Sequence, residues 1–486
     1  MALQIFNSLS QKKEEFVPLT PGVVKMYLCG PTVYGLLHIG NFRGPIFFNL
    51  VRNWLEISGY DVTFVYNYTD VDDRIIEKAI NEKSASWVIS ERYIGEFRSD
   101  FANLKLRPHD RNPKVTESMP AIVSMIDDLV RNGSAYVSEG EVLFSVRKFS
   151  EYGKLSHRNI DDLKKAAPGE LNQKKTDPLD FALWKPAKPG EPKWPSPWGE
   201  GRPGWHIECS AMIRDILGDT IDIHGGGMDL LFPHHENEIA QSEACTGKAF
   251  VKYWMHNNMI NFGDKKMSKS LGNIKTARDF LKEYNAEILK YMMLSIHYRS
   301  ISDFSEMAIE NAISGLARIY SSLALAHQLH SSSDIVPGSV SVEFDKVLKT
   351  ENEQIRKSLD DDFNTPEMMA SFFKVVRSFN ALFRYGMKIT PEVRATCLCF
   401  ESWLREKGSM LSLFQEDASH YLRILDDMLL LQKNLERSAI DKLVFDRARA
   451  RKDKDFKLGD EIRAQLTTLG IKVFDLGDTS QWEVEK

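Results

Sequence analysis

A strand–helix–strand pattern near the start of the 486-residue chain leaves few folds open. Residues 23–28 form a nearly continuous apolar run, which is typical of a strand buried on both faces of a sheet. Apolar residues then recur at helical spacing over 46–55, Gly59 stands where helices commonly end, and 61–68 again has a strand pattern. A right-handed crossover makes two such strands parallel, and such sheets bind ligands at the carboxyl ends of their strands.

The rest of the chain divides into segments of different character. Residues from about 110 to 200 have a mixed pattern, which we interpret as an insertion into the first domain. After it, 220–223 predicts a short strand that runs into three glycines, so the sheet resumes there. Beyond about residue 305, apolar residues at helical spacing and few glycines predict helices, and the last 50 residues combine a basic helix pattern with a strand at 471–474.

We therefore predict an α/β protein. A Rossmann-like domain with a parallel sheet and an insertion is followed by an α-helical bundle domain and a small C-terminal α+β domain. The expected boundaries are 1–255 for the Rossmann-like domain with its insertion at about 110–200, 256–310 for a junction region with a mobile loop, 311–435 for the helical domain and 436–486 for the C-terminal domain.

Composition and charge narrow the classes of protein to consider. Hydrophobic residues make up 43% and charged residues 27%, which is an ordinary globular balance. No apolar run approaches the roughly 18 to 20 residues of a membrane span, and the N-terminus lacks a basic segment followed by an apolar one, so we expect a cytoplasmic protein with no membrane contact. Five cysteines favour a reducing compartment over a disulfide framework. The net charge of -5 indicates no polyanion partner, although a local basic surface still permits one.

Two segments have the composition of phosphate-binding sites. His38-Ile39-Gly40-Asn41 lies between the first strand and the following helix, where free backbone N–H groups and the helix dipole favour a phosphate. Lys266-Met267-Ser268-Lys269-Ser270 lies in a glycine-flanked stretch suited to a mobile basic loop that neutralises charge on a leaving pyrophosphate. Each segment alone also fits a structural or solvated turn. Together and in this order, they are far more specific and predict an enzyme that uses ATP.

A possible metal site lies between the two segments in sequence. His234 and Glu238 are four residues apart in a helix expected to begin at Pro233, so they share one helix face. Cys29 follows the first strand and Cys209 follows the insertion, and both converge on that helix if the sheet is wound as predicted. Sulfur, nitrogen and carboxylate ligands suit zinc.

Other interpretations of these residues stay open at this point. Acidic residues in a first helical turn interact with the helix dipole, and buried cysteines are common packing residues. Spacing alone does not exclude His235 as a ligand in place of its neighbour. Gly226 and Asp229 follow the strand at 220–223, where they either hold an adenosine or form a tight turn.

These motifs resemble those of a known enzyme family. The two phosphate-binding segments are similar to the two signatures of class I aminoacyl-tRNA synthetases, which adenylate an amino acid and transfer it to tRNA. Within that class, 27–41, 204–212 and 224–238 resemble the cysteinyl-tRNA synthetases, and the resemblance extends over nearly the whole chain. At Asn41 the class signature usually has a second histidine, and an amide carries no charge, which weakens the expected phosphate contact.

The resemblance implies a complete site for ATP, L-cysteine and one zinc ion per chain. The implied zinc ligands are Cys29, Cys209, His234 and Glu238. The residues implied for Mg-ATP are His38, Gly40, Asn41, Gly226, Asp229, Lys266 and Lys269, of which His38, Lys266 and Lys269 are catalytic. The residues implied around the bound cysteine are Gly30, Thr69 and Trp205. Packing in an aromatic core explains Trp205 equally well.

Zinc gives a physical account of the implied specificity. A thiolate is a soft ligand that binds zinc strongly, whereas a serine hydroxyl binds it poorly. A pocket without such a ligand resolves one small group by only ~1 to 3 kcal/mol, and the insertion looks too short to be an editing domain. We therefore expect the substrate sulfur to coordinate the metal, so that zinc recognises the substrate and does not generate hydroxide.

The resemblance also implies partners. It assigns tRNA binding to 311–435 and anticodon binding to 436–486 of a monomer, with the partner tRNA(Cys). The basic residues near 447–457 are candidate phosphate contacts, although acidic residues intervene. A related ligase that joins cysteine to an amino sugar shares these motifs, but it needs no long helical region. A catalytically silent tRNA-binding regulator would have no reason to keep Lys266 and Lys269.

Overall fold

The computed structural model describes residues 2–162, 174–262, 265–266, 276–331, 334–476 and 479–486. The chain forms two compact units. The first unit comprises 1–278, 293–303 and 354–368, and the second comprises 279–292, 304–353 and 369–486.

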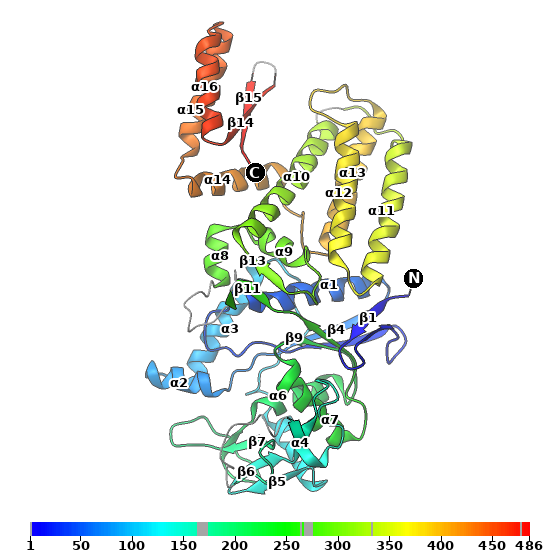
Figure 1. Ribbon diagram of the computed structural model, residues 1–486, viewed down its shortest axis with the longest axis vertical. Coiled ribbons are helices and arrows are strands. Elements are labelled where there is room, and N and C mark those ends of the chain that lie inside the picture. Colours follow the sequence, from blue (N-terminus) through cyan, green and yellow to red (C-terminus); the bar gives the residue numbers. More distant parts are fainter. Residues whose placement is uncertain (1, 163–173, 263–264, 267–275, 332–333, 477–478) are drawn as a thin grey trace. The chain divides into compact units, whose positions relative to one another are not determined.

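A four-stranded parallel sheet is the centre of the first unit (Figure 1). Its strands are β3 (Val23–Leu28), β4 (Asp61–Tyr66), β9 (Ile221–Gly227) and β10 (Val251–Asn257), in the spatial order β10-β9-β3-β4. All three pairings are parallel, which confirms the predicted α/β sheet and its resumption after the insertion. Strand β9 includes the three glycines that were expected to follow it, and β4 ends two residues earlier than the pattern predicted.

Helices cover both faces of this sheet (Figure 1). Helix α1 (Arg43–Ile57) packs on one face through fully buried side chains such as Phe48 and Leu50, and Gly59 just beyond it has a positive φ of 95°, as its place predicted. Helices α6 (Trp205–Leu217) and α7 (Glu236–Thr246) cover the other face. All chain segments that leave the carboxyl ends of the strands therefore meet at one edge.

The insertion contains its own small sheet. Helix α4 (Met119–Arg131) precedes a four-stranded antiparallel sheet of order β5-β6-β7-β8. Its strands and a short helical turn are β5 (Ala135–Ser138), β6 (Glu141–Phe144), η2 (Val146–Lys148), β7 (Phe181–Pro186) and β8 (Gly201–Pro203). The first unit also contains the hairpin β1 (Gln4–Asn7) and β2 (Lys12–Glu15) and the helices α2 (Asp73–Asn81) and α3 (Ser86–Asn103).

Short elements follow the parallel sheet along the chain. They are β11 (Ile260–Phe262), β12 (Lys265–Lys266), α8 (Ala277–Glu283), α9 (Ala286–Leu294) and β13 (Ser302–Phe304). The chain then becomes helical at α10, close to the residue 305 that the pattern predicted. The long helices are α10 (Glu306–Ser331), α11 (Val342–Asp360), α12 (Thr365–Leu382) and α13 (Pro391–Ser409).

The C-terminal part is a small α+β module with its own apolar cluster. It consists of α14 (Ala418–Gln432), α15 (Arg437–Lys452), α16 (Phe456–Thr468), β14 (Ile471–Leu476) and β15 (Thr479–Val484). The strand predicted at 471–474 is β14, whereas its antiparallel partner β15 was not predicted. Within the described residues, every helix is too short or too polar to span a lipid bilayer.

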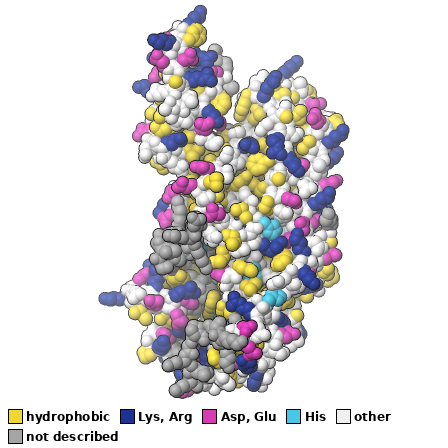
Figure 2. All heavy atoms as spheres, viewed as in Figure 1, with side chains coloured by type: hydrophobic (Ala, Val, Ile, Leu, Met, Phe, Trp, Pro, Cys, Tyr) yellow, Lys and Arg dark blue, Asp and Glu magenta, His cyan; other side chains and the backbone are white. Residues whose placement is uncertain are grey.

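Charges of both signs alternate on this module. Figure 2 shows Lys and Arg side chains beside Asp and Glu side chains over α15 and α16. One of the predicted phosphate contacts is not available there, because Arg447 is buried and forms a two-pronged ion pair with Asp475, at 2.7 and 3.1 Å. The prediction is therefore wrong for Arg447, which is a structural residue.

Candidate functional site

A cavity of about 450 Å³ lies at the carboxyl ends of the parallel strands, where the sequence predicted a ligand site. The predicted site residues that line it are Cys29, Gly30, His38, Gly40, Asn41, Thr69, Trp205, Cys209, Gly226, Asp229 and His234. They come from the ends of three strands and from positions at or just before the starts of three helices, α1, α6 and α7. Residues far apart in the chain thus converge because the parallel winding brings these ends to one edge.

The four predicted metal ligands meet at this cavity: Cys29, Cys209 and His234 line it, and Glu238 lies behind them. Cys29 Sγ lies 3.7 Å from Cys209 Sγ, 3.6 Å from His234 Nε2 and 3.4 Å from Glu238 Oε1. His234 Nε2 and Glu238 Oε1 are 2.9 Å apart, and all four donor atoms lie within 4.8 Å of one another. Two sulfurs, one imidazole nitrogen and one carboxylate oxygen at such separations match the donor set and spacing of a tetrahedral zinc site.

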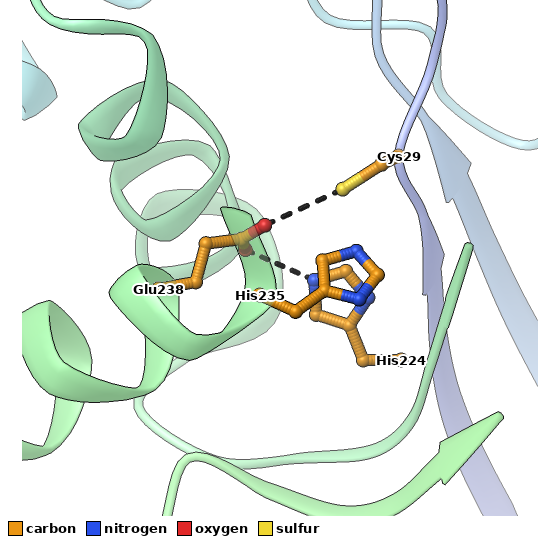
Figure 3. A group of neighbouring side chains, drawn as sticks. All are labelled: Cys29, His224, His235 and Glu238. Atoms are coloured by element: carbon orange, nitrogen blue, oxygen red, sulfur yellow. Dashed lines mark hydrogen bonds and ion pairs between the residues drawn. The ribbon is translucent and has the colours of Figure 1, made fainter. Parts of the chain in front are cut away.

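A second combination of ligands shares two of these residues. Cys29, His224, His235 and Glu238 also lie within 4.8 Å of one another, and Figure 3 shows Glu238 between Cys29 and His224. The Oε2 atom of Glu238 is 3.0 Å from His224 Nε2, whereas its Oε1 atom faces Cys29. The two combinations share Cys29 and Glu238 and differ in the other two residues. Cys209 and His234 line the cavity, whereas His224 and His235 do not, so a ligand in the cavity reaches the combination that contains Cys209 and His234. The geometry thus favours His234 over the alternative His235.

Electrostatics keeps the cluster charged although it is buried. Burial opposes ionisation of Glu238, but His224 and His234 outweigh it and lower the pKa of Glu238 to about 2. Burial likewise opposes a charge on His234, but Glu238 and Cys209 raise its pKa to about 10. The thiol of Cys29 donates a hydrogen bond to Cys209 and lowers the pKa of Cys209 to about 6, while burial raises the pKa of Cys29. The carboxylate and one thiolate are therefore available to a cation.

Aromatic side chains hold His234 in place. The indole of Trp205 stacks on its imidazole, with ring centroids 4.5 Å apart, and His206 Nδ1 lies 2.9 Å from His234 Nδ1. Trp205 is 37% exposed and lines the cavity, so it does not belong to an aromatic core. Its place is consistent with the role around the amino acid that the sequence resemblance implied.

The turn before helix α7 differs from the prediction. Pro233 is not the first residue of this helix, because Leu231–His235 forms a separate π-helical turn (η3), the Phe232–Pro233 peptide bond is cis and α7 begins at Glu236. His234 and Glu238 nevertheless meet, since the π-helical turn continues directly into the helix. The expectation that Pro233 begins a helix was correct in placing a helix start nearby, but the helix begins three residues later than predicted.

The first phosphate-binding segment forms the entrance to helix α1. A short 3₁₀ helix, η1 (Ile39–Phe42), follows His38, and the side-chain oxygen of Asn41 accepts a hydrogen bond from the His38 backbone N–H at 3.1 Å. This hydrogen bond uses the side-chain oxygen of Asn41, so the side-chain NH₂ group remains to contact a ligand. The second segment cannot be placed in the same way, because Lys269 and the side chain of Lys266 lie outside the described residues.

Glycines bring the backbone close to other groups around the cavity. A Cβ atom at Gly30 would lie 1.6 Å from the backbone oxygen of Asn67, and a Cβ atom at Gly226 would lie 2.5 Å from the His235 ring. Asn67 also accepts a hydrogen bond from the Gly30 N–H at 2.8 Å and donates one to Thr69 Oγ1 at 3.3 Å. Only glycine fits at these two positions, and Asn67 links the end of β4 to the end of β3.

Several residues of the site were not predicted. Arg74 lines the cavity, where its guanidinium donates to Thr32 Oγ1 at 3.0 Å and lies over the ring of Tyr34. His206 and Asn67 support predicted residues from behind and gave no sequence signal, because each acts through a partner that is distant in the chain. His206 and His224 lie in the segments 204–212 and 224–238 that carry the family resemblance, but their contacts with His234 and Glu238 were not predicted.

Comparison with known proteins identifies the class to which this fold and site belong. The family described as tRNA synthetases class I (C) catalytic domain matches residues 15–314, and the DALR domain matches residues 354–415. The fold is similar to that of a Mycobacterium tuberculosis methionyl-tRNA synthetase in complex with methionyl-adenylate (TM-score 0.63, 14% identity, 82% of this chain and 93% of that chain). It is also similar to a putative arginyl-tRNA synthetase from Campylobacter jejuni (TM-score 0.57, 12% identity, 81% and 94%). The chain is a class I aminoacyl-tRNA synthetase.

Relatives over the full length narrow this class. The chain is 57% identical over 484 residues to a cysteine–tRNA ligase of Bdellovibrio bacteriovorus, with 100% of both chains covered. It is 44% identical over 486 residues to one of Geobacter sulfurreducens (100% of both chains), and 44% identical over 483 residues to one of Anoxybacillus flavithermus (99% of both). The chain belongs to the cysteine–tRNA ligase family, which confirms the resemblance seen in its sequence.

Proposed function

We propose that this ligase recognises its amino acid through a zinc ion held by Cys29, Cys209, His234 and Glu238. It activates L-cysteine with Mg-ATP to cysteinyl-adenylate and transfers the aminoacyl group to the 3′ end of tRNA(Cys). The observation that carries the proposal is the cluster of two sulfurs, one nitrogen and one oxygen within 4.8 Å, of which both sulfur residues and the histidine line the cavity. When bound, zinc supplies a soft cation that prefers a thiolate to a hydroxyl.

The residues around the cluster prepare it for this role. His224 occupies Glu238 Oε2, so that Oε1 faces the sulfurs, and this contact orients the carboxylate. Trp205 stacks on one face of the His234 imidazole and shields that face from water. Gly30 and Thr69 line the same part of the cavity, next to Cys29, and are proposed to contact the rest of the cysteine.

The ATP side of the proposal rests on other residues that line the same cavity. His38, Gly40 and Asn41 lie at the start of η1, where backbone N–H groups favour phosphate, and Gly226 and Asp229 follow β9. The carboxylate of the bound amino acid attacks the α-phosphate in line and pyrophosphate leaves, so no covalent enzyme intermediate is needed. His38, Lys266 and Lys269 are proposed to stabilise the charge on the phosphates.

We propose that successive segments of the chain have separate functions. We assign the chemistry to 1–255, the Lys266 and Lys269 loop to 256–310, tRNA binding to the helical part at 311–435 and anticodon binding to 436–486, in a monomer that acts in the cytoplasm. The match of the DALR domain to 354–415 supports a separate module in the helical part.

Cysteine-dependent exchange of pyrophosphate into ATP tests the zinc proposal. We expect exchange with L-cysteine and none with L-serine at equal concentration, and we expect Cys209→Ser to lose zinc and cysteine-dependent exchange together. A Cys209→Ser variant that binds no zinc but still selects cysteine over serine would refute the role of the metal.

A variant of the second phosphate-binding segment tests the proposed catalytic lysine. Lys269→Ala should reduce adenylate formation far more than cysteine binding, and equal losses would contradict its catalytic role.

A further inference from the structure

Two neighbouring helices of the second unit bring three metal-binding side chains together. His327 and His330 lie near the end of α10, and Glu401 lies on α13, which packs against α10. The Oε2 atom of Glu401 is 2.7 Å from His330 Nε2 and 3.5 Å from His327 Nδ1. One ligand atom from each of the three residues lies within 4.8 Å of the other two.

The surroundings of these residues orient their ligand atoms and leave one side of the cluster open to solvent. The two histidines are three residues apart, so they point from the same face of α10, and their ring centroids are 5.0 Å apart. Arg405 lies one turn further along α13 and approaches Oε1 of Glu401 at 3.5 Å, which leaves Oε2 directed at the imidazoles. His327 is 56% exposed, whereas the side chains of His330 and Glu401 are only 13% and 19% exposed. An ion can therefore enter from solvent on the side of His327 and reach two ligands that are largely buried.

We propose that His327, His330 and Glu401 form a second site for a divalent transition metal, separate from the cluster in the cavity. Two imidazoles and a carboxylate are the ligand set of many three-ligand zinc sites, in which water completes the coordination. The cysteines of α13 are not part of it, since Cys397 is fully buried and neither it nor Cys399 belongs to the cluster. A metal here joins α10 to α13 and stabilises the helical part of the protein.

Metal stoichiometry of the full-length protein tests the site. We expect wild-type protein to bind two equivalents of Zn²⁺ in equilibrium dialysis, and His330→Ala and Glu401→Gln to bind one. His420→Ala, which removes an exposed histidine on α14, should still bind two. Wild-type protein that binds one equivalent, or variants that both keep two, would overturn the proposal and leave a His–Glu ion pair as the role of the cluster.

Cobalt distinguishes the two sites by their ligands. Co²⁺ bound to thiolates has a sulfur-to-metal charge-transfer band, and Co²⁺ bound to imidazole and carboxylate alone has none. His330→Ala should therefore keep the charge-transfer band and lose one equivalent of Co²⁺, and aminoacylation should be unchanged. The melting temperature of wild-type protein should rise when the second equivalent of Zn²⁺ is added, and that of His327→Ala should not. Loss of the charge-transfer band in His330→Ala would show that the change acts on the cavity cluster and would refute a separate site.

Discussion

His206 and His234 face each other through their Nδ1 atoms, which are 2.9 Å apart. One of the two must donate, and burial lowers the pKa of His206 to about 3, so that His206 stays neutral and its Nδ1 is able to accept. His234 then keeps a proton on Nδ1, so that Nε2, which faces the cluster, is the nitrogen that gives up its proton to bind a metal. This contact selects the tautomer of His234 that a metal requires.

Removal of the His206 imidazole should therefore weaken zinc binding without removing a ligand. We expect His206→Ala to lower zinc affinity by about 10- to 100-fold, the usual effect of losing a partner of a metal-bound histidine. The measurement is competition with a chromophoric chelator. Unchanged affinity would show that the ring of His234 is oriented by Trp205 alone.

Zinc affinity at the cavity should depend on pH with a definite sign. The pKa of His234 is raised to about 10 in the metal-free cluster, so at neutral pH zinc must displace a proton from this imidazole. Each displaced proton weakens binding by about tenfold for every unit that the pH falls below that pKa. Chelator competition at several pH values, together with a pH indicator for released protons, measures both effects. Zinc affinity that is constant between about pH 6.5 and 8.5 would contradict this electrostatic picture.

A substitution at Gly30 tests whether activity requires the close backbone contact between the ends of β3 and β4. A methyl group at Gly30 would lie 1.6 Å from the backbone oxygen of Asn67, whereas one at Gly35 would meet no heavy atom within 4 Å. We expect Gly30→Ala to lower kcat/KM for cysteine in pyrophosphate exchange by about 100-fold, because the ends of β3 and β4 must move apart. Gly35→Ala is the matched control and should be close to wild type. Similar activities of the two variants would refute the need for close contact.

The sequence predicted those parts of the site that depend on residues close together in the chain or on a family motif. The nearly continuous apolar run at 23–28 predicted β3 because burial on both faces favours apolar side chains, and parallel winding then placed Cys29 beside Cys209. The zinc ligands were recognised by residue type and by family motif, and the structure brings them together.

Contacts across space left no such pattern. Nothing in the sequence around His206 says that it meets His234, and the π-helical turn at Leu231–His235 broke the register that Pro233 predicted. Strand β15 was missed because its sequence is short and mostly polar, and it is held by pairing with β14. Arg447 was misread as a surface charge for the same reason, since its partner Asp475 lies in β14.

Neighbouring aspartates in the first unit should differ strongly in their contribution to stability. Asp362 is fully buried and accepts hydrogen bonds from a backbone N–H, from Tyr298 at 2.7 Å and from Arg299 at 2.7 Å. Asp361 is about half exposed, and its carboxylate pairs with Lys13. We expect Asp362→Ala to lower the free energy of unfolding by about 3 kcal/mol, because it leaves a guanidinium and a buried hydroxyl without their acceptor. Asp361→Ala should cost at most about 1 kcal/mol. Urea unfolding measures both, and equal effects would contradict the structural role of Asp362.

The C-terminal module allows a test that separates a structural arginine from a surface arginine. Arg447 is 3% exposed and holds Asp475 with two hydrogen bonds, and this contact keeps the pKa of Asp475 well below its usual value. Arg449 lies two residues away, is 66% exposed and has only a 3.7 Å contact with Asp446. We expect Arg447→Ala to destabilise the module by about 1 to 2 kcal/mol, which speeds amide hydrogen exchange in α15 and β14 by roughly tenfold.

The same experiment has an internal control and a pH dependence. Arg449→Ala should leave exchange in the module unchanged, since it removes no buried contact. A carboxylate with a lowered pKa contributes its stabilisation above its unfolded pKa and loses it as the pH falls toward the folded value, so the difference between Arg447→Ala and wild type should shrink in acid. Because Asp475 is more than one third exposed, solvent screens part of this effect. Equal exchange in Arg447→Ala and Arg449→Ala at neutral pH would show that the Arg447 pair does not hold the module together, and would restore Arg447 as a candidate contact for tRNA phosphates.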